Sequence, residues 1–93
     1  MIRILVADDH AIVRNGLKQI VGDTPDMIVA AEASNGREAL NKALEDDFDV
    51  VLLDITMPDR SGLDILKEIK SQKPELPVLI LSIHPEEQYA VRA

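Results

Sequence analysis

The chain has 93 residues, enough for one domain, and 46% of them are hydrophobic, enough to supply a core. Its 10 Lys and Arg against 17 Asp and Glu give a net charge of −7, which repels phosphate backbones and anionic lipid and argues against direct contact with nucleic acid. It has no cysteine and no apolar run near the roughly 20 residues that a membrane span needs, so we expect a cytoplasmic protein without membrane contact.

The first third of the chain predicts a strand, a helix and a second strand. The aliphatic run "IRILVA" at 2–7 has strand length, and "MIVAAEA" at 27–33, which contains Glu32, suits a sheet edge. Between them an apolar stripe with helical spacing consists of Ile12, Val13, Leu17, Ile20 and Val21. Arg14 and Lys18 lie a turn apart, and we expect them to form a solvated face.

The rest of the chain repeats this alternation. Ser34 or Asn35 can cap a second helix, which is followed by the strand "VVLL" at 50–53. A third helix and the strand "VLIL" at 78–81 follow, and "HPEEQYAVRA" at 84–93 has the features of a helix start. The stripes of the second and third helices consist of Ala39, Leu40, Ala43 and Leu44, and of Leu63, Leu66 and Ile69.

Strict alternation of strands and helices predicts an α/β fold. Its sheet is parallel, its crossovers are right-handed, and helices cover both faces in a doubly wound arrangement. Ligands of such sheets bind beyond the carboxyl ends of the strands. Those ends are therefore the place to look for functional side chains.

Acidic and hydroxyl side chains follow three of the predicted strands. Asp8 and Asp9 end the first strand, Asp54 the third and Ser82 the fourth. Each alone is consistent with a helix cap, a turn residue or a satisfied strand-end hydroxyl, but their combination indicates a shared site. If the first and third strands are neighbours, three carboxylates converge, and Mg²⁺ or Mn²⁺ suits such a set of oxygen ligands. Asp54 is then a candidate nucleophile for phosphoryl transfer.

Residues around these acids have simpler interpretations. His10 follows the acidic pair at a helix start, and we expect a solvated first-turn residue rather than a ligand. Pro58 stiffens the loop after Asp54, and Gly62 allows that loop to pass closely into the next helix.

Three stretches together resemble the receiver domain of bacterial two-component response regulators. They are "ILVADDH" with Asp8 and Asp9, "VVLLDITMPDRSG" with Asp54, and "VLILS" with Ser82. They match in order and spacing over essentially the whole chain. The "DDH" followed by "VRNGL" is similar to the LuxR-type (NarL-type) subgroup, which carries a DNA-binding output domain. The resemblance implies a flavodoxin-like (CheY-like) fold with strand order 2-1-3-4.

The resemblance also implies a mechanism. A sensor histidine kinase would transfer a phosphoryl group to Asp54, while Asp8, Asp9, Asp54 and the backbone carbonyl of Thr56 would hold Mg²⁺. Ser82 would be the switch hydroxyl that binds the phosphoryl oxygen. The chain would then be a phosphoacceptor signalling domain and not an enzyme with a separate substrate, and it would regulate transcription through an output domain.

The sequence departs from the family pattern at its C-terminal end. It ends at Ala93, whereas a receiver continues to a fifth strand and helix, so we expect residues 1–93 to be one receiver domain, incomplete at its C-terminus, with the output domain absent. In the family, a lysine that comes after the fourth strand lies near the phosphoryl group. This sequence has no lysine after Lys73. Without a fifth strand, "VLIL" becomes an apolar edge, and we expect homo-oligomers that associate through residues 78–82.

Other functions fit the sequence less well. A haloacid-dehalogenase-type phosphatase needs a second acid two residues after its nucleophile, where this chain has Thr56. A cobalamin-binding module needs glycine where Val13 stands, and a dinucleotide site needs a glycine-rich loop that the sequence lacks. The remaining alternative is a non-catalytic receiver-like module for dimerisation or docking.

Overall fold

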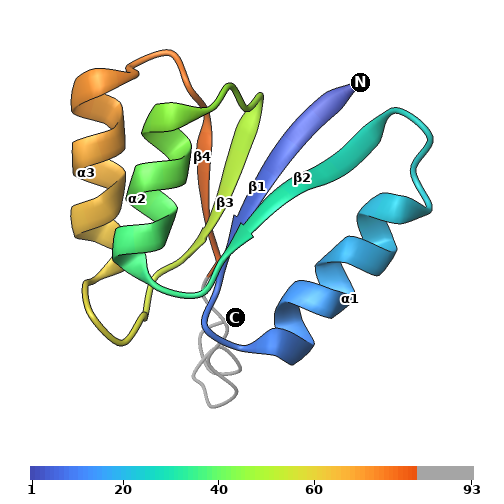
Figure 1. Ribbon diagram of the computed structural model, residues 1–93, viewed down its shortest axis with the longest axis horizontal. Coiled ribbons are helices and arrows are strands. Elements are labelled where there is room, and N and C mark those ends of the chain that lie inside the picture. The colour runs from blue at the N-terminus through green and yellow to red at the C-terminus, as the bar shows by residue number, and fades with distance from the viewer. Residues whose placement is uncertain (82–93) are drawn as a thin grey trace, which may run out of the picture.

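A computed structural model describes residues 1–81, in which strands and helices alternate strictly (Figure 1). The elements are β1 (Ile2–Ala7), α1 (Ala11–Gly22), β2 (Met27–Ala33), α2 (Gly36–Glu45), β3 (Val50–Asp54), α3 (Gly62–Gln72) and β4 (Val78–Leu81). All four expected strands are confirmed. The expected helix start at 84–93 and the candidate Ser82 lie outside the described residues. Within 1–81 no helix is long and apolar enough to cross a membrane.

The four strands form one parallel sheet in the order β2-β1-β3-β4, which confirms the flavodoxin-like α/β fold. β2 lies at an edge, as its weaker pattern predicted. β1 and β3 are neighbours, with Ala7 opposite Leu53. Asp8 and Asp54 come directly after this last pair in the chain, so they lie side by side at the carboxyl end of the sheet.

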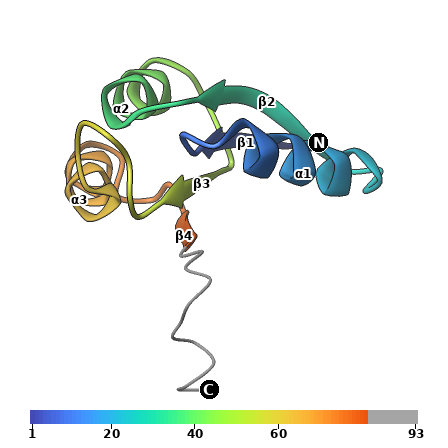
Figure 2. The same ribbon diagram turned by 90° about the horizontal axis from the view of Figure 1, so that it is seen from below.

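The helices cover both faces of the sheet: α1 lies on one face, and α2 and α3 lie on the other (Figure 2). Because side chains of a strand alternate between faces, β1 sends Leu5 and Ala7 to one face and Ile4 and Val6 to the other. Within the described residues 1–81, the core under α2 and α3 has twelve buried members, namely Leu5, Ala7, Ala33, Ala39, Ala43, Phe48, Val51, Leu53, Met57, Ile65, Ile69 and Leu76. The core under α1 has three, Ile4, Val6 and Val21.

Two of the predicted apolar stripes are narrower than their sequences indicated. On α1, Ile12 is 85% exposed and Ile20 67% exposed, whereas Val21 is buried and Leu17 packs beside it. The residues of α1 that are spaced i, i+4 and i+8, Leu17 and Val21 among them, face the sheet. Ile12 and Ile20 lie to the side of that line. On α3, Leu63 is 47% exposed, and Ile65, which the predicted stripe omitted, is fully buried.

The ends of the helices follow from side-chain caps. Of the two candidates for α2, Asn35 is the cap, because its side chain accepts a hydrogen bond from the Glu38 amide at 2.8 Å. Ser61 caps α3 by accepting from the Leu63 amide at 3.1 Å. Both helices therefore begin at fixed points beyond the carboxyl ends of the strands.

Candidate functional site

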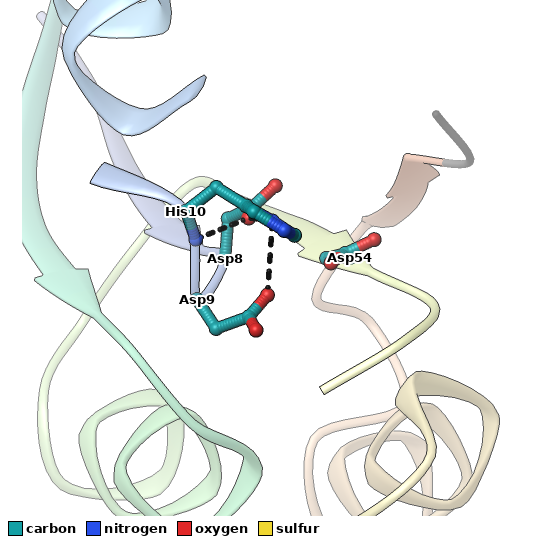
Figure 3. Close-up of side chains that lie close together, drawn as sticks. All are labelled: Asp8, Asp9, His10 and Asp54. Carbon is teal, nitrogen blue, oxygen red and sulfur yellow. Dashed lines mark hydrogen bonds and ion pairs between the residues drawn. The ribbon is translucent and has the colours of Figure 1, made fainter. Parts of the chain in front are cut away.

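Three carboxylates meet at the carboxyl end of the sheet (Figure 3). Asp8 and Asp9 directly follow β1, and Asp54 is the last residue of β3. One ligand atom from each of them, together with a ring nitrogen of His10, lies within 4.8 Å of all the others. The pairing of β1 with β3 thus brings together the acids that the sequence places far apart.

Two of these acids are withdrawn from solvent. Asp8 is 1% exposed and Asp54 6% exposed. Burial raises the pKa of Asp54 above its ordinary value, and the nearby charge of Asp8 raises it further, while a backbone hydrogen bond from Thr56 opposes the shift. Ionising Asp54 therefore costs more than ionising an exposed aspartate, and a positive charge beside it would lower that cost.

The donor atoms of the three acids suit a hard divalent cation. Carboxylate oxygens are the ligands that Mg²⁺ takes, and it is typically held by one or two carboxylates together with water and phosphate oxygens. A cation at this position would offset the mutual repulsion of Asp8, Asp9 and Asp54. The residues present therefore fit a magnesium site.

His10 lies against the acidic pair. It is the N-cap residue of α1, and its backbone amide donates to Asp8 Oδ1 at 2.8 Å. Its Nδ1 is 2.9 Å from Asp8 Oδ1 and 3.0 Å from Asp9 Oδ1. The hydrogen bond to Asp8 and then the charge of Asp9 raise the pKa of the imidazole. The side chain is 66% exposed, as expected for a first-turn residue, yet its ring also contacts the site.

The loop from Asp54 to α3 passes very close to the strand it leaves. A Cβ atom on Gly62 would lie 2.2 Å from the carbonyl oxygen of Asp54, so only glycine fits there. The Gly62 amide donates to the Ile55 carbonyl at 2.8 Å, and Thr56 pairs with Ser61 in an isolated bridge. The loop that carries Thr56 is thereby fixed at its base.

Asp59 fixes the tip of the same loop. Its carboxylate accepts from the amides of Gly36 at 2.7 Å and Arg37 at 3.0 Å, at the beginning of α2. These two backbone hydrogen bonds lower the pKa of Asp59. Sequence reasoning missed this contact, because it joins residues 22 and 23 positions apart in the chain.

Arg14 and Lys18 are not merely a solvated face. Arg14 Nη1 donates to the Asp8 carbonyl at 2.6 Å, and Arg14 Nε lies 3.0 Å from Glu32 Oε1. Lys18 Nζ lies 2.8 Å from Glu32 Oε2. A lone acid within a strand, together with basic residues a turn apart on the preceding helix, was the signal for this cluster. Arg14 connects the cluster to the backbone at the end of β1.

A parallel sheet of this order, with an acidic pair after the first strand and a buried aspartate ending the third, defines a phosphoryl-accepting signalling module of the two-component type. The family model for the response regulator receiver domain matches residues 4–93. The chain belongs to this family, and the resemblance drawn from its motifs is confirmed.

Two curated relatives illustrate the range of proteins that contain such a domain. The chain is 41% identical over 88 residues to the oxygen regulatory protein NreC of Staphylococcus haemolyticus, covering 94% of the chain and 41% of that protein. It is 44% identical over 81 residues to a protein-glutamate methylesterase/protein-glutamine glutaminase of Treponema denticola, covering 87% of the chain and 22% of that protein. The chain thus spans less than half the length of these relatives.

Solved structures agree with this assignment. The response regulator TrrA of Thermotoga maritima, in complex with Mg(2+)-BeF, is 36% identical with a TM-score of 0.83, over 90% of this chain and 71% of that one. A LuxR-family two-component response regulator from Aurantimonas is 31% identical with a TM-score of 0.83, over 97% of this chain and 64% of that one. Similarity to a LuxR-family regulator is in line with the subgroup expected from the "DDH" motif.

Proposed function

We propose that this receiver domain accepts a phosphoryl group on Asp54 from a sensor histidine kinase. The observation that carries the proposal is the buried Asp54 carboxylate, held within reach of Asp8 and Asp9. Asp8, Asp9, Asp54 and the backbone carbonyl of Thr56 are the proposed ligands of Mg²⁺. The magnesium complex of the similar TrrA structure supports this choice of ion.

The chain's own residues define the proposed reaction. An oxygen of ionised Asp54 attacks phosphorus, the new P–O bond forms an acyl phosphate, and the bond to the donor nitrogen breaks with its electron pair left on the donor imidazole. A bound Mg²⁺ would neutralise charge on the transferring group. The close approach of Gly62 to the Asp54 backbone and the contacts of Asp59 hold the loop beyond Asp54 in place.

The proposed signal is a change at the fourth strand. Phosphorylation adds negative charge and acceptor oxygens beside the end of β4, where Asp54 pairs with Leu81. Ser82, the next residue, is the proposed switch hydroxyl. Its capture by the phosphoryl group would shift a two-state surface that controls an output, which we propose is a LuxR-type domain regulating transcription.

The proposal has further parts that concern partners and setting. The chain has no separate substrate to turn over, it works in the cytoplasm with a sensor kinase, and it does not itself contact DNA, in line with its net charge of −7. Copies associate through residues 78–82, because among residues 1–81 β4 pairs only with β3 and Leu79 is 56% exposed. Light scattering that shows only monomers at high concentration would contradict this association.

The alternative, a docking module that is never phosphorylated, gains no support from the described residues. Such a module has no use for adjacent buried carboxylates, which cost stability when no cation joins them. Loss of any of the three acids would be the mark of such a module, and Asp8, Asp9 and Asp54 are all present.

Intact-mass spectrometry tests phosphoryl acceptance directly. After incubation with acetyl phosphate and Mg²⁺, we expect the mass to increase by about 80 Da, one phosphoryl group. We expect no increase when a chelator is present during the incubation. The gain should be lost in Asp54→Asn and kept in Asp26→Asn, whose aspartate is exposed and lies at the opposite end of the sheet. An unmodified wild-type mass, or a gain that persists in Asp54→Asn, would overturn the assignment of Asp54.

A further inference from the structure

We propose that His10 is a fourth side-chain ligand of the acidic site and gives it a preference for later first-row transition ions, such as Ni²⁺ or Cu²⁺, over Mg²⁺. The inference rests on the proposed metal site of Asp8, Asp9 and Asp54. It adds a nitrogen donor to a site that otherwise offers only oxygen. The site would then discriminate between divalent ions by the chemistry of its ligands.

The distances around His10 match the edge of an octahedral coordination shell. Two adjacent ligands of an octahedral ion with bonds of about 2.1 Å lie about 3.0 Å apart. His10 Nδ1 is 2.9 Å from an oxygen of Asp8 and 3.0 Å from an oxygen of Asp9. The whole set, Asp54 included, lies within 4.8 Å, close to the separation of about 4.2 Å between opposite ligands of the same ion. Little movement would bring all four atoms onto one ion.

The backbone explains why the imidazole is held there. His10 lies at the start of α1 with extended backbone angles, and its amide donates to Asp8 Oδ1. The ring consequently turns back over the end of β1, and Figure 3 shows it between the acidic pair and Asp54. Its side chain is 66% exposed, so it can shift to admit an ion without disrupting the core.

Ligand chemistry then determines the preferred ions. Imidazole nitrogen suits Ni²⁺, Cu²⁺ and Zn²⁺, whereas Mg²⁺ and Mn²⁺ prefer carboxylate, carbonyl and water oxygens. The three acids alone would accept either kind of ion. His10 therefore improves binding of the transition ion and leaves the binding of Mg²⁺ nearly unchanged.

Pulsed electron paramagnetic resonance of the full chain loaded with Cu²⁺ at pH 8, where free imidazole is neutral, tests this directly. A nitrogen ligand produces a ¹⁴N coupling, and growth with ¹⁵N-histidine should convert it to the ¹⁵N pattern. The chain has two histidines, so His84→Gln is the matched control. We expect His84→Gln to keep the coupling and His10→Gln to lose it.

Calorimetric titrations complete the test. We expect His10→Gln to weaken Ni²⁺ binding about tenfold or more, with a much smaller change for Mg²⁺. Bound Cu²⁺ without histidine coupling in the labelled wild-type chain would overturn the role of His10 and leave the acidic metal site standing. Failure of the wild-type chain to bind either ion would overturn both, so the two failures are distinguishable.

Discussion

The two faces of the sheet are held to their helices by different interactions. Among residues 1–81, the α2 and α3 face has twelve buried core members, whereas the α1 face has three and adds the ion pairs of Glu32 with Arg14 and Lys18. The site draws on both faces, since Asp54 leads into the loop to α3 and Asp8 leads into α1. Asp54, the proposed nucleophile, is thus attached to the side with the larger described core, and the acidic pair to the side with less apolar packing.

Shortening one buried side chain on each face should give the largest difference in stability between the two faces. Ile65 and Val21 are both buried, at 0% and 6% exposure. We expect Ile65→Ala to lower the free energy of unfolding by about 3–4 kcal/mol and Val21→Ala by about 1–2 kcal/mol, because the first opens a cavity in a larger core. Urea unfolding followed by circular dichroism measures both.

If Ile65→Ala does not fold, Ile65→Val provides the same comparison, with an expected loss of about 1 kcal/mol for one methylene. Equal costs per methylene removed at Ile65 and at Val21 would mean that the two faces contribute alike, and the contrast between them would fail.

Replacing glycine with alanine should change the stability of the protein in opposite directions on the two faces of the sheet. At Gly62 a Cβ would meet the Asp54 carbonyl oxygen at 2.2 Å, whereas at Gly16, inside α1, it meets nothing within 4 Å. We expect Gly62→Ala to cost about 2–3 kcal/mol and to impair phosphoryl acceptance, because the loop at Asp54 must shift. Gly16→Ala should stabilise by about 0.5–1 kcal/mol. Thermal unfolding and the mass assay would record both, and a neutral Gly62→Ala would show that the close passage is not needed.

The smallest expected effect concerns the ion pairs of the α1 face. Hydrogen bonds from Lys18 and then Arg14 lower the pKa of Glu32, so its stabilising contribution is present above the ordinary pKa of about 4.3 and is lost as pH falls through the lower folded value. We expect Glu32→Gln to cost at most about 1 kcal/mol at neutral pH. The difference from wild type should shrink in high salt and vanish at low pH. A constant difference from neutral to acidic pH would assign the effect to packing.

Much of this architecture follows from short-range patterns. Four aliphatic runs gave the strands, and the acids that end them predicted where Asp8 and Asp54 would meet, because parallel strands share an orientation. The predicted apolar stripes included Ile12, Ile20 and Leu63, which are exposed. Helical spacing identifies the apolar side of a helix but not how much of that side the sheet covers. The contacts of Arg14 and Asp59 were missed, because each depends on tertiary packing between separate segments.

The Asp59 carboxylate has one more consequence. It accepts the amides of Gly36 and Arg37 at the start of α2, where unpaired amides and the positive end of the helix would otherwise attract an anion from solution. The fold thus fills this anion cradle with a group of its own. Under the proposed function, a phosphoryl donor would find no free backbone nest at α2, and its negative charge would have to be met by cations bound near Asp54.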